Sequence, residues 1–272
     1  MTQVTGAVIL AAGLGSRLRP HTNLVPKPLV KVLGTPILHN TLHQLSEHGV
    51  SEATIVVGYR QEVIREACGR RFENVDISYV ANPIFDRTGS AYSLWMARDT
   101  LLCGDTVFIE GDVFFDGEVL GRTLQNQGRS LADQNVAAVA SFATAMSGSA
   151  VELDADGFVS TFVMNQTPQA ARALGLFKTI NITAFSVATS RAHLMPALQC
   201  AVDAGDTKAY VEQIQAGLLD RGELRLSTVD CSDIRWFEID TEADLRIAEN
   251  LFSNGRSNRK ACDRGELPGG LR

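Results

Sequence analysis

A glycine-rich loop carrying a basic residue is the part of the sequence best suited to chemistry. The loop occupies residues 10–20 (LAAGLGSRLRP), where Gly13 and Gly15 let the backbone approach a ligand closely. Backbone N–H groups of such a loop can form a nest for an anion, and Arg17 lies inside it. A dinucleotide fingerprint would need a third glycine where Leu18 stands, and the P-loop pattern is absent. The loop therefore predicts phosphate binding of another kind.

A lysine between two prolines follows the loop. Pro26 fixes its own φ, and Pro28 biases Lys27 toward extended backbone, so the ammonium is presented from a stiffened segment. A solvated lysine in a turn is the alternative. Residues 1–46 carry four basic residues and no acid, whereas the remainder has a net charge of −10. This pattern favours a small anionic ligand, and the total charge of −6 argues against nucleic-acid binding.

The loop and the lysine together carry a family resemblance. LAAGLGSRL followed by PKPL resembles the nucleotidyltransferases of the sugar-phosphate and choline-phosphate type, which have a GT-A-like fold. The resemblance implies that the loop holds a nucleoside triphosphate, that the arginine meets its β- and γ-phosphates, and that the lysine meets its α-phosphate. The implied nucleotide-site residues are Ala11, Ala12, Gly13, Gly15, Ser16, Arg17 and Lys27.

The same resemblance implies two metal-binding aspartates. Asp112 follows the predicted strand 106–110, and Asp240 ends the predicted strand 236–239. Carboxylates at the C-terminal ends of strands in an open α/β sheet point into the ligand crevice, and Mg²⁺ prefers one or two carboxylates together with phosphate oxygens. The alternatives are a turn residue for Asp112 and an N-terminal helix charge for Asp240. The expected cofactor is Mg²⁺.

Polar residues between these elements are candidates for contacts with the base. In the family, the segments that correspond to Asn82 and to Thr88-Gly89-Ser90 line the base pocket. Asn82 offers both donors and acceptors to a pyrimidine edge. Ser90 is also predicted to be the N-cap of a helix, and both roles are compatible.

The segment GLFKTINITAFS, residues 175–186, indicates the acceptor side. It resembles the K-T-[VI]-N-I-Y pattern of the cytidylyltransferases that activate phosphonates, and departs from it at Thr183. Lys178 is expected to bind the anion of the acceptor, with a snorkelling edge lysine as the alternative. The expected acceptor-binding residues are Lys178, Asn181, Tyr210 and Glu212.

The elements that must position these residues alternate between strands and helices. The periodicity predicts strands 4–11, 54–57, 75–80, 106–110, 136–142, 177–187 and 236–239, and helices 37–48, 61–69, 90–102, 190–202, 210–220 and 241–251. Residues 151–163 predict a hairpin around an Asp-Gly turn. We therefore expect an α/β fold, a doubly wound, mostly parallel, Rossmann-like sheet with helices on both faces and a small hairpin insertion. The domain is expected to cover residues 1–252, followed by a flexible tail, 253–272.

The predicted activity is transfer of CMP from CTP to a small phosphonate with release of pyrophosphate. A choline-phosphate cytidylyltransferase, a sugar-1-phosphate uridylyl- or thymidylyltransferase and a non-catalytic nucleotide sensor are the alternatives. The five cysteines have no short pair spacing, and no long uncharged apolar run predicts a membrane span. A cytoplasmic location is expected. The sequence does not determine the oligomeric state, and a homodimer is one option.

Overall fold

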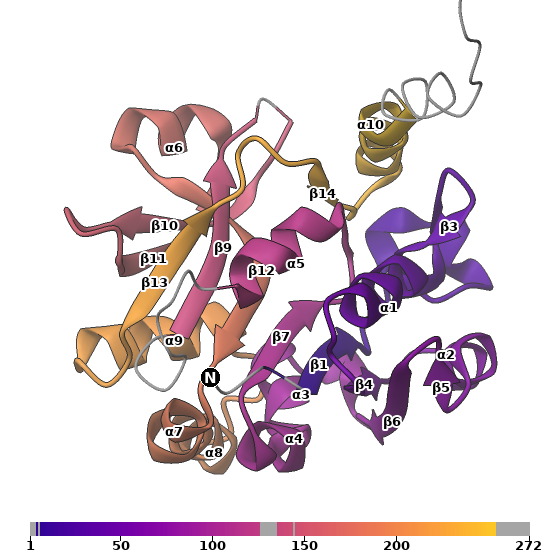
Figure 1. The fold of residues 1–272 in the computed structure, drawn as a ribbon, viewed down its shortest axis with the longest axis horizontal. Helices are drawn as coiled ribbons and strands as arrows, with labels where there is room; N and C mark the ends of the chain where they lie inside the picture. Colours follow the sequence, from indigo (N-terminus) through magenta and orange to yellow (C-terminus); the bar gives the residue numbers. More distant parts are fainter. Residues whose placement is uncertain (1–3, 5, 126–134, 144, 254–272) are drawn as a thin grey trace, which may run out of the picture.

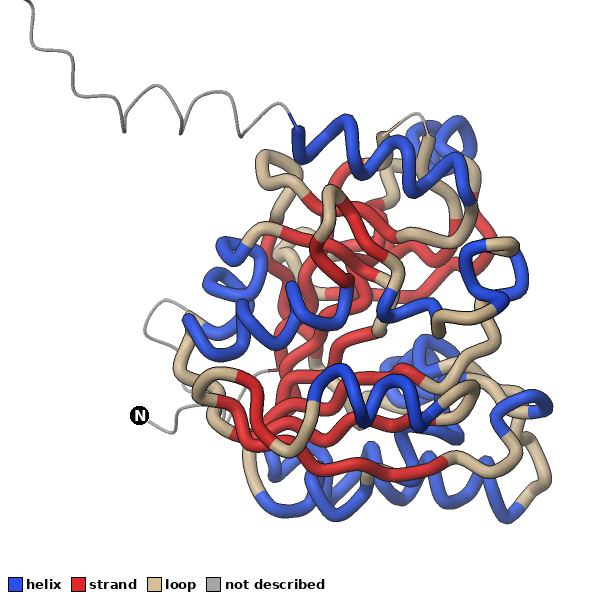
Figure 2. Tube along the Cα trace, turned by 90° about the vertical axis from the view of Figure 1, so that its right-hand side faces the viewer, coloured by secondary structure: helices blue, strands red, loops and turns tan. Residues whose placement is uncertain are grey.

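The protein is built in layers around a central sheet. The computed structural model describes residues 4, 6–125, 135–143 and 145–253. Within them, ten strands form one mixed sheet, and Figure 2 shows helices on both sides of the strands. This arrangement confirms the predicted doubly wound α/β class.

The N-terminal half of the sheet is parallel. β1 (Gly6–Ala11) pairs in parallel with β4 (Glu52–Val57) on one side and with β7 (Thr106–Glu110) on the other. β6 (Val75–Ala81) continues the parallel order beyond β4. β1 is buried at nearly every position, as a continuous apolar run predicts for a strand covered on both faces.

The C-terminal half of the sheet mixes directions. β12 (Phe177–Phe185) runs antiparallel to β7, to β9 (Asn135–Ser141) and to β10 (Gly148–Leu153). The predicted hairpin is formed by β10 and β11 (Val159–Gln166). The main sheet also contains β13 (Leu226–Asp230), which is parallel to β9, and the edge strand β5 (Arg71–Phe72), which is antiparallel to β6. β2 (Lys31–Val32) and β3 (Thr35–Pro36) form a separate pair.

The helices lie against the two faces of the sheet (Figure 1), and their buried apolar residues form a core on each face. One face is covered by α1 (Ile37–Glu47), α2 (Gln61–Cys68) and α5 (Gly117–Leu124), whose buried leucines, isoleucine and valine join one core. The other face is covered by α3 (Ser90–Met96), α4 (Arg98–Cys103), α8 (Met195–Asp203) and α9 (Val211–Asp220). The remaining helices are α6 (Pro168–Leu174), α7 (Val187–Thr189) and α10 (Glu242–Ser253).

A small two-stranded ladder stands apart from the main sheet. β8 (Val113–Phe115) pairs antiparallel with β14 (Trp236–Glu238). α10 follows directly, and its start has a capping box, since the Thr241 hydroxyl accepts from the amide of Asp244 at 3.2 Å and the Asp244 carboxylate accepts from the amide of Thr241 at 2.7 Å. The ladder and the capping box together therefore fix the chain on the two sides of Asp240.

Three local predictions are wrong. The helix expected over 90–102 is interrupted at Ala97, which separates α3 from α4. Gly89, not Ser90, is the N-cap of α3, and the Ser90 hydroxyl instead accepts from the amide of Val211 at 3.0 Å. Lys27 begins a single 3₁₀ turn rather than extended backbone, so the flanking prolines stiffen a turn.

The expected tail, 253–272, lies outside the described residues except for Ser253, which ends α10. None of the helices among the described residues is long and apolar enough to cross a membrane.

Candidate active site

A pocket of about 320 Å³ opens at the C-terminal end of β1, where the chain enters the glycine loop. Most of the predicted site residues line it: Ala11, Ala12, Gly13, Gly15, Ser16, Arg17, Lys27, Thr88, Gly89, Ser90, Asp112 and Asp240. The carboxyl ends of β1 and β7 both reach this pocket, as expected for an open α/β sheet.

The loop is shaped by two glycines with different roles. A Cβ at Gly13 would meet no atom within 4 Å, so the backbone here is open to the pocket. Gly15 has a φ of 61°, and a Cβ there would lie 2.8 Å from the Cβ of Lys27. The Thr22 hydroxyl donates to the carbonyl of Gly15 at 2.7 Å, and the Tyr59 hydroxyl donates to the carbonyl of Thr22 at 3.0 Å. The loop is therefore braced against the lysine segment.

Lys27, Asp112 and Asp240 meet at one side of the pocket. Lys27 Nζ lies 2.7 Å from Asp112 Oδ2 and 2.6 Å from Asp240 Oδ1. Arg17 also contacts Asp240 Oδ1, at 2.8 Å, from a largely exposed side chain. Three segments far apart in the sequence thus converge on one cluster of charges.

The charges of this cluster shift one another's ionisation. Burial would lower the pKa of Lys27, but the carboxylates of Asp112 and Asp240 outweigh it and raise that pKa above its usual range. Burial would raise the pKa of Asp240, but Lys27 and Arg17 outweigh it and lower that pKa. Both groups are therefore charged at neutral pH.

The donor set fits a divalent cation. Asp112 Oδ1 is buried and has no hydrogen-bond partner among the described residues. Two carboxylates provide hard oxygen ligands of the kind that Mg²⁺ prefers. Within the described residues, no three His, Cys, Asp or Glu side chains form a metal site by themselves. Further oxygens would therefore have to come from bound phosphates and water, which is usual for Mg²⁺.

Asn82 lies behind the wall of the pocket. It is 1% exposed, its amide nitrogen donates to the hydroxyls of Thr88 and Ser93 at 2.9 and 3.1 Å, and its oxygen accepts from the amide of Ile84. Asn82 does not line the pocket in this structure, so its direct contact with the base stays a prediction. Asn82 positions Thr88 and Ser93, and those two residues line the pocket.

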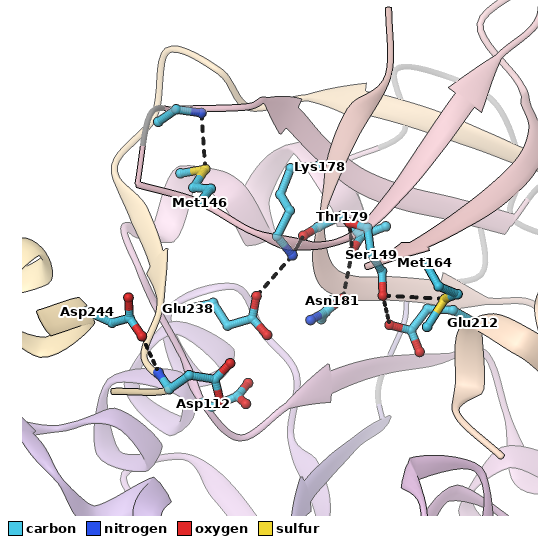
Figure 3. A network of polar contacts seen from close by, with 12 residues as sticks. Asp112, Met146, Ser149, Met164, Lys178, Thr179, Asn181, Glu212, Glu238 and Asp244 are labelled. Carbon is cyan, nitrogen blue, oxygen red and sulfur yellow. Dashed lines mark hydrogen bonds and ion pairs between the residues drawn. The ribbon is translucent and has the colours of Figure 1, made fainter. Parts of the chain in front are cut away.

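Lys178 is also buried, in an ion pair outside this pocket (Figure 3). It is 2% exposed, and its Nζ lies 2.9 Å from Glu238 Oε2 and 3.1 Å from the carbonyl of Thr179. Burial raises the pKa of Glu238, and Lys178 opposes that shift. In this position the ammonium does not reach the main pocket, so direct contact with an acceptor stays a prediction.

Of the other expected acceptor residues, Asn181 and Glu212 make polar contacts inside the protein, whereas Tyr210 is exposed. Asn181 has a φ of 60° at an irregularity between β12 and β9, and its side-chain oxygen accepts from the Thr179 hydroxyl at 2.9 Å. Glu212 Oε1 accepts from the Ser149 hydroxyl at 3.0 Å, while its Oε2 is buried without a partner among the described residues. Figure 3 shows these groups on one side of the Lys178–Glu238 pair. Tyr210 is 54% exposed and does not line the pocket.

Glu110 brings a further carboxylate to the pocket wall. It ends β7, two residues before Asp112. Burial raises the pKa of Glu110 well above its usual value, and the charges of Glu212, Asp112 and Glu238 raise it further. In the sequence, the signal that Glu110 belongs to the site was its position at the end of a predicted strand. Nothing local signals the roles of Tyr59, Ser149 and Glu238, because their partners lie far away in the sequence.

Solved structures with the same fold are nucleotidyltransferases. The CTP:phosphocholine cytidylyltransferase of Streptococcus pneumoniae matches 92% of this chain and 99% of its own with a TM-score of 0.72, at 21% identity. The inositol-1-phosphate CTP transferase of T. maritima matches 93% of this chain and 97% of its own with a TM-score of 0.70, at 19% identity. At such identities the likeness concerns the fold alone.

Two curated relatives are similar in sequence. The CMP-5'-(3-aminopropyl)phosphonate synthase of Streptomyces rubellomurinus is 33% identical over 258 residues, which are 94% of this chain and 40% of that protein. The 2-aminoethylphosphonate cytidylyltransferase of Lancefieldella rimae is 34% identical over 114 residues, which are 42% of this chain and 45% of that protein. The matched regions span less than half the length of each relative.

The fold and the site define a nucleotide-binding α/β protein in which a glycine loop, a lysine and two aspartates share one pocket. Residues 6–163, more than half of the chain, match the family model described as nucleotidyl transferase. The chain belongs to the nucleotidyl transferase family, and the resemblance read from the loop and Lys27 is confirmed.

Proposed function

We propose that this protein transfers CMP from CTP to a small phosphonate, giving a CMP-phosphonate and pyrophosphate. The names of the two curated relatives support this acceptor class. The observation that carries the proposal is the convergence of Lys27 on Asp112 and Asp240 beside the glycine loop. One pocket then offers a backbone cradle, fixed cations and carboxylates to the phosphates of a nucleotide.

The triphosphate would lie along the loop. Backbone N–H groups around Gly13, which has open space on its Cβ side, can donate to the β- and γ-phosphates, and the exposed guanidinium of Arg17 can reach the same oxygens. The ammonium of Lys27 would neutralise charge on the α-phosphate. Thr88, Gly89 and Ser90 also line the pocket and would contact the base.

The reaction needs little proton transfer. A phosphonate oxygen of the acceptor attacks the α-phosphorus in line, a P–O bond forms, and the bond to the bridging oxygen breaks, so that pyrophosphate leaves with the electron pair. The acceptor is largely ionised at pH 7, because a phosphate-type second pKa is about 6. No side chain has to act as a general base, and catalysis depends on positioning and on charge.

Asp112 and Asp240 would hold Mg²⁺, whose fit rests on the unpartnered Asp112 Oδ1 and on the two carboxylates. When bound, the ion would supply positive charge to the oxygens of the α-phosphate and of the acceptor. Lys178 adds positive charge on the far side of Asp240, whose pKa it helps to lower.

We further propose that the acceptor carries a primary ammonium group. Glu212 Oε2 is a buried acceptor atom without a partner in the part of the chain that the structure describes, and Glu110 lies close enough for Glu212 to shift its pKa. An unpaired buried carboxylate is unfavourable, so a cation at this end would be stabilised. A quaternary ammonium would favour an aromatic cage, whereas Phe85 is the single aromatic residue that lines the pocket within the described residues.

The test is pyrophosphate release with CTP, UTP, GTP and dTTP against 2-aminoethylphosphonate, 2-hydroxyethylphosphonate, phosphonoformate, choline phosphate and glucose-1-phosphate, with and without Mg²⁺. We expect Mg²⁺-dependent turnover with CTP and the aminoalkylphosphonate. Lys27→Ala should lower that turnover by about 10²–10³-fold. Preference for glucose-1-phosphate with UTP or dTTP would contradict the proposal, as would turnover with no member of the panel.

A further inference from the structure

The ammonium of Lys27 occupies the space that a metal ion bound to Asp112 Oδ2 and Asp240 Oδ1 would need. Its Nζ is within 2.7 Å of one oxygen of each carboxylate, and the lysine side chain is only 13% exposed. Mg²⁺ binds its oxygen ligands at about 2.0–2.1 Å, so an ion bound to the two oxygens that contact Lys27, Asp112 Oδ2 and Asp240 Oδ1, would have to lie where this ammonium lies. The lysine and the divalent cation therefore compete for one position.

The charges of the cluster are balanced without any ligand. Arg17 and Lys27 together neutralise Asp112 and Asp240 through contacts of 2.6–2.8 Å. A divalent cation arriving alone would meet two fixed positive charges beside its ligands. A triphosphate arriving alone would meet two carboxylates. A cation and a triphosphate that arrive together give each of these four groups a partner of opposite charge, because the cation takes the carboxylates and the two basic side chains move onto the phosphates.

We propose that Lys27 is the resident counter-ion of the metal site and keeps divalent cations out until a nucleoside triphosphate draws its ammonium onto the phosphates. The inference rests on the proposed metal site and assigns this lysine a second role besides its action on the α-phosphate. Cation and nucleotide then bind cooperatively, and by linkage each raises the affinity of the other by the same factor.

The packing around Lys27 allows such an exchange. The inner part of the Lys27 side chain packs closely against Gly15. A Cβ added at Gly15 would lie 2.8 Å from Lys27 Cβ and 3.5 Å from its Cγ. The carbonyl of Lys27 accepts from the amide of Val30 at 3.0 Å, which fixes the backbone in its turn. Beyond Cγ the chain is flexible, as lysine side chains generally are. Only the outer part has to move between the carboxylates and the loop.

The experiment measures Mn²⁺ binding by the electron paramagnetic resonance of the free ion, without acceptor and therefore without turnover. In the wild-type protein, CTP should tighten Mn²⁺ binding by at least about 10-fold, which corresponds to about 1.4 kcal/mol of coupling. Lys27→Met should bind Mn²⁺ without CTP at least about 10-fold more tightly than the wild type, and CTP should add little. Lys27→Arg, which keeps a cation there, should resemble the wild type. Lys31→Met is the matched control, because Lys31 is exposed in the same segment and touches neither aspartate.

Two results would overturn the inference. One is wild-type Mn²⁺ affinity that is the same with and without CTP, which needs no variant and holds even if Lys27→Met fails to fold. The other is a folded Lys27→Met protein that binds Mn²⁺ no more tightly than the wild type. If either accompanies normal Mg²⁺-dependent turnover of CTP, the proposed function stands and only the counter-ion role fails. Absence of both turnover and Mn²⁺ binding would refute the two together.

Discussion

The backbone amide of Ile239 donates a hydrogen bond to the carbonyl oxygen of Asp112 at 2.9 Å. This bond extends the β8–β14 ladder by one step and holds the two aspartates of the site side by side, although 127 positions separate Asp112 from Ile239. Asp240 follows immediately, and its amide donates to the Asp244 carboxylate at 3.1 Å. The backbone at both carboxylates is thus fixed before any ligand binds.

Gly15→Ala should impair both the loop and Lys27. The new methyl would lie 2.8 Å from Lys27 Cβ, and the backbone φ of 61° costs a non-glycine residue about 1–2 kcal/mol. We expect a lower melting temperature and at least about a 10-fold fall in kcat/KM for CTP, equivalent to about 1.4 kcal/mol of transition-state binding. Gly13→Ala is the matched control for stability, because its Cβ meets no atom within 4 Å. Equal melting temperatures for the two variants would contradict this explanation.

Asn82→Ala distinguishes two roles for Asn82, which are to position Thr88 and Ser93 or to contact the base directly. Removal of an amide that makes three buried hydrogen bonds should lower the free energy of unfolding by about 1–3 kcal/mol. The KM for CTP should rise while the ratio of CTP to UTP turnover stays unchanged, because Thr88 and Ser93 lose their support together. Asn74→Ala, at an exposed position, should change neither quantity. A marked change in the CTP to UTP ratio would show that Asn82 contacts the base after all.

Glu212→Gln should weaken binding of the acceptor and spare the nucleotide. Loss of the negative charge beside an ammonium costs about 1.5–3 kcal/mol, so the KM for 2-aminoethylphosphonate should rise about 10- to 100-fold. The KM for CTP and the turnover of 2-hydroxyethylphosphonate should hardly change. Glu223→Gln is the control, since Glu223 pairs with Arg221 at 2.8 Å just beyond the end of α9. An equal loss with both acceptors would exclude an ammonium contact.

Cys68 should make stability fall at alkaline pH. Burial raises the pKa of its thiol from 9.0 to about 12 in the folded protein. Between these values the unfolded chain releases a proton that the folded chain retains, so stability is complete below about pH 9 and declines as the pH rises toward 12. Cys68→Ala should flatten urea-derived stability between pH 9 and 10.5, whereas Cys103→Ala, at an exposed thiol, should leave the slope as it is.

Local chemistry made much of the site predictable. Glycine at positions 13 and 15, an acid-free segment and a lysine between prolines are signals contained in a few adjacent residues, and strand ends indicated where Asp112 and Asp240 should lie. The alternation of apolar runs with helical periods was enough for the fold class, because both faces of the sheet bury helices.

The parts of the fold and of the site that the sequence did not predict depend on contacts between distant segments. β13 has an ordinary sequence (LSTVD) and becomes a strand because it pairs with β9. Lys178 could be placed on a strand, but its burial follows from Glu238, sixty positions away, whose partner no local pattern reveals. Asn82 has a side chain suited to a base edge, and only the positions of Thr88 and Ser93 show that its amide is already engaged.

The pairing of β8 with β14 has a consequence for dissection of the chain. Residues 6–163 match the family model, yet this stretch contains one carboxylate of the pair and lacks the strand that its edge needs. A fragment cut at that boundary would expose β8 and half a binding site. Reassembly would need a separately expressed piece that carries β12, which joins β7 to β9 and β10, together with Trp236–Glu238 and α10. Recovery of activity would then show that the two pieces had assembled.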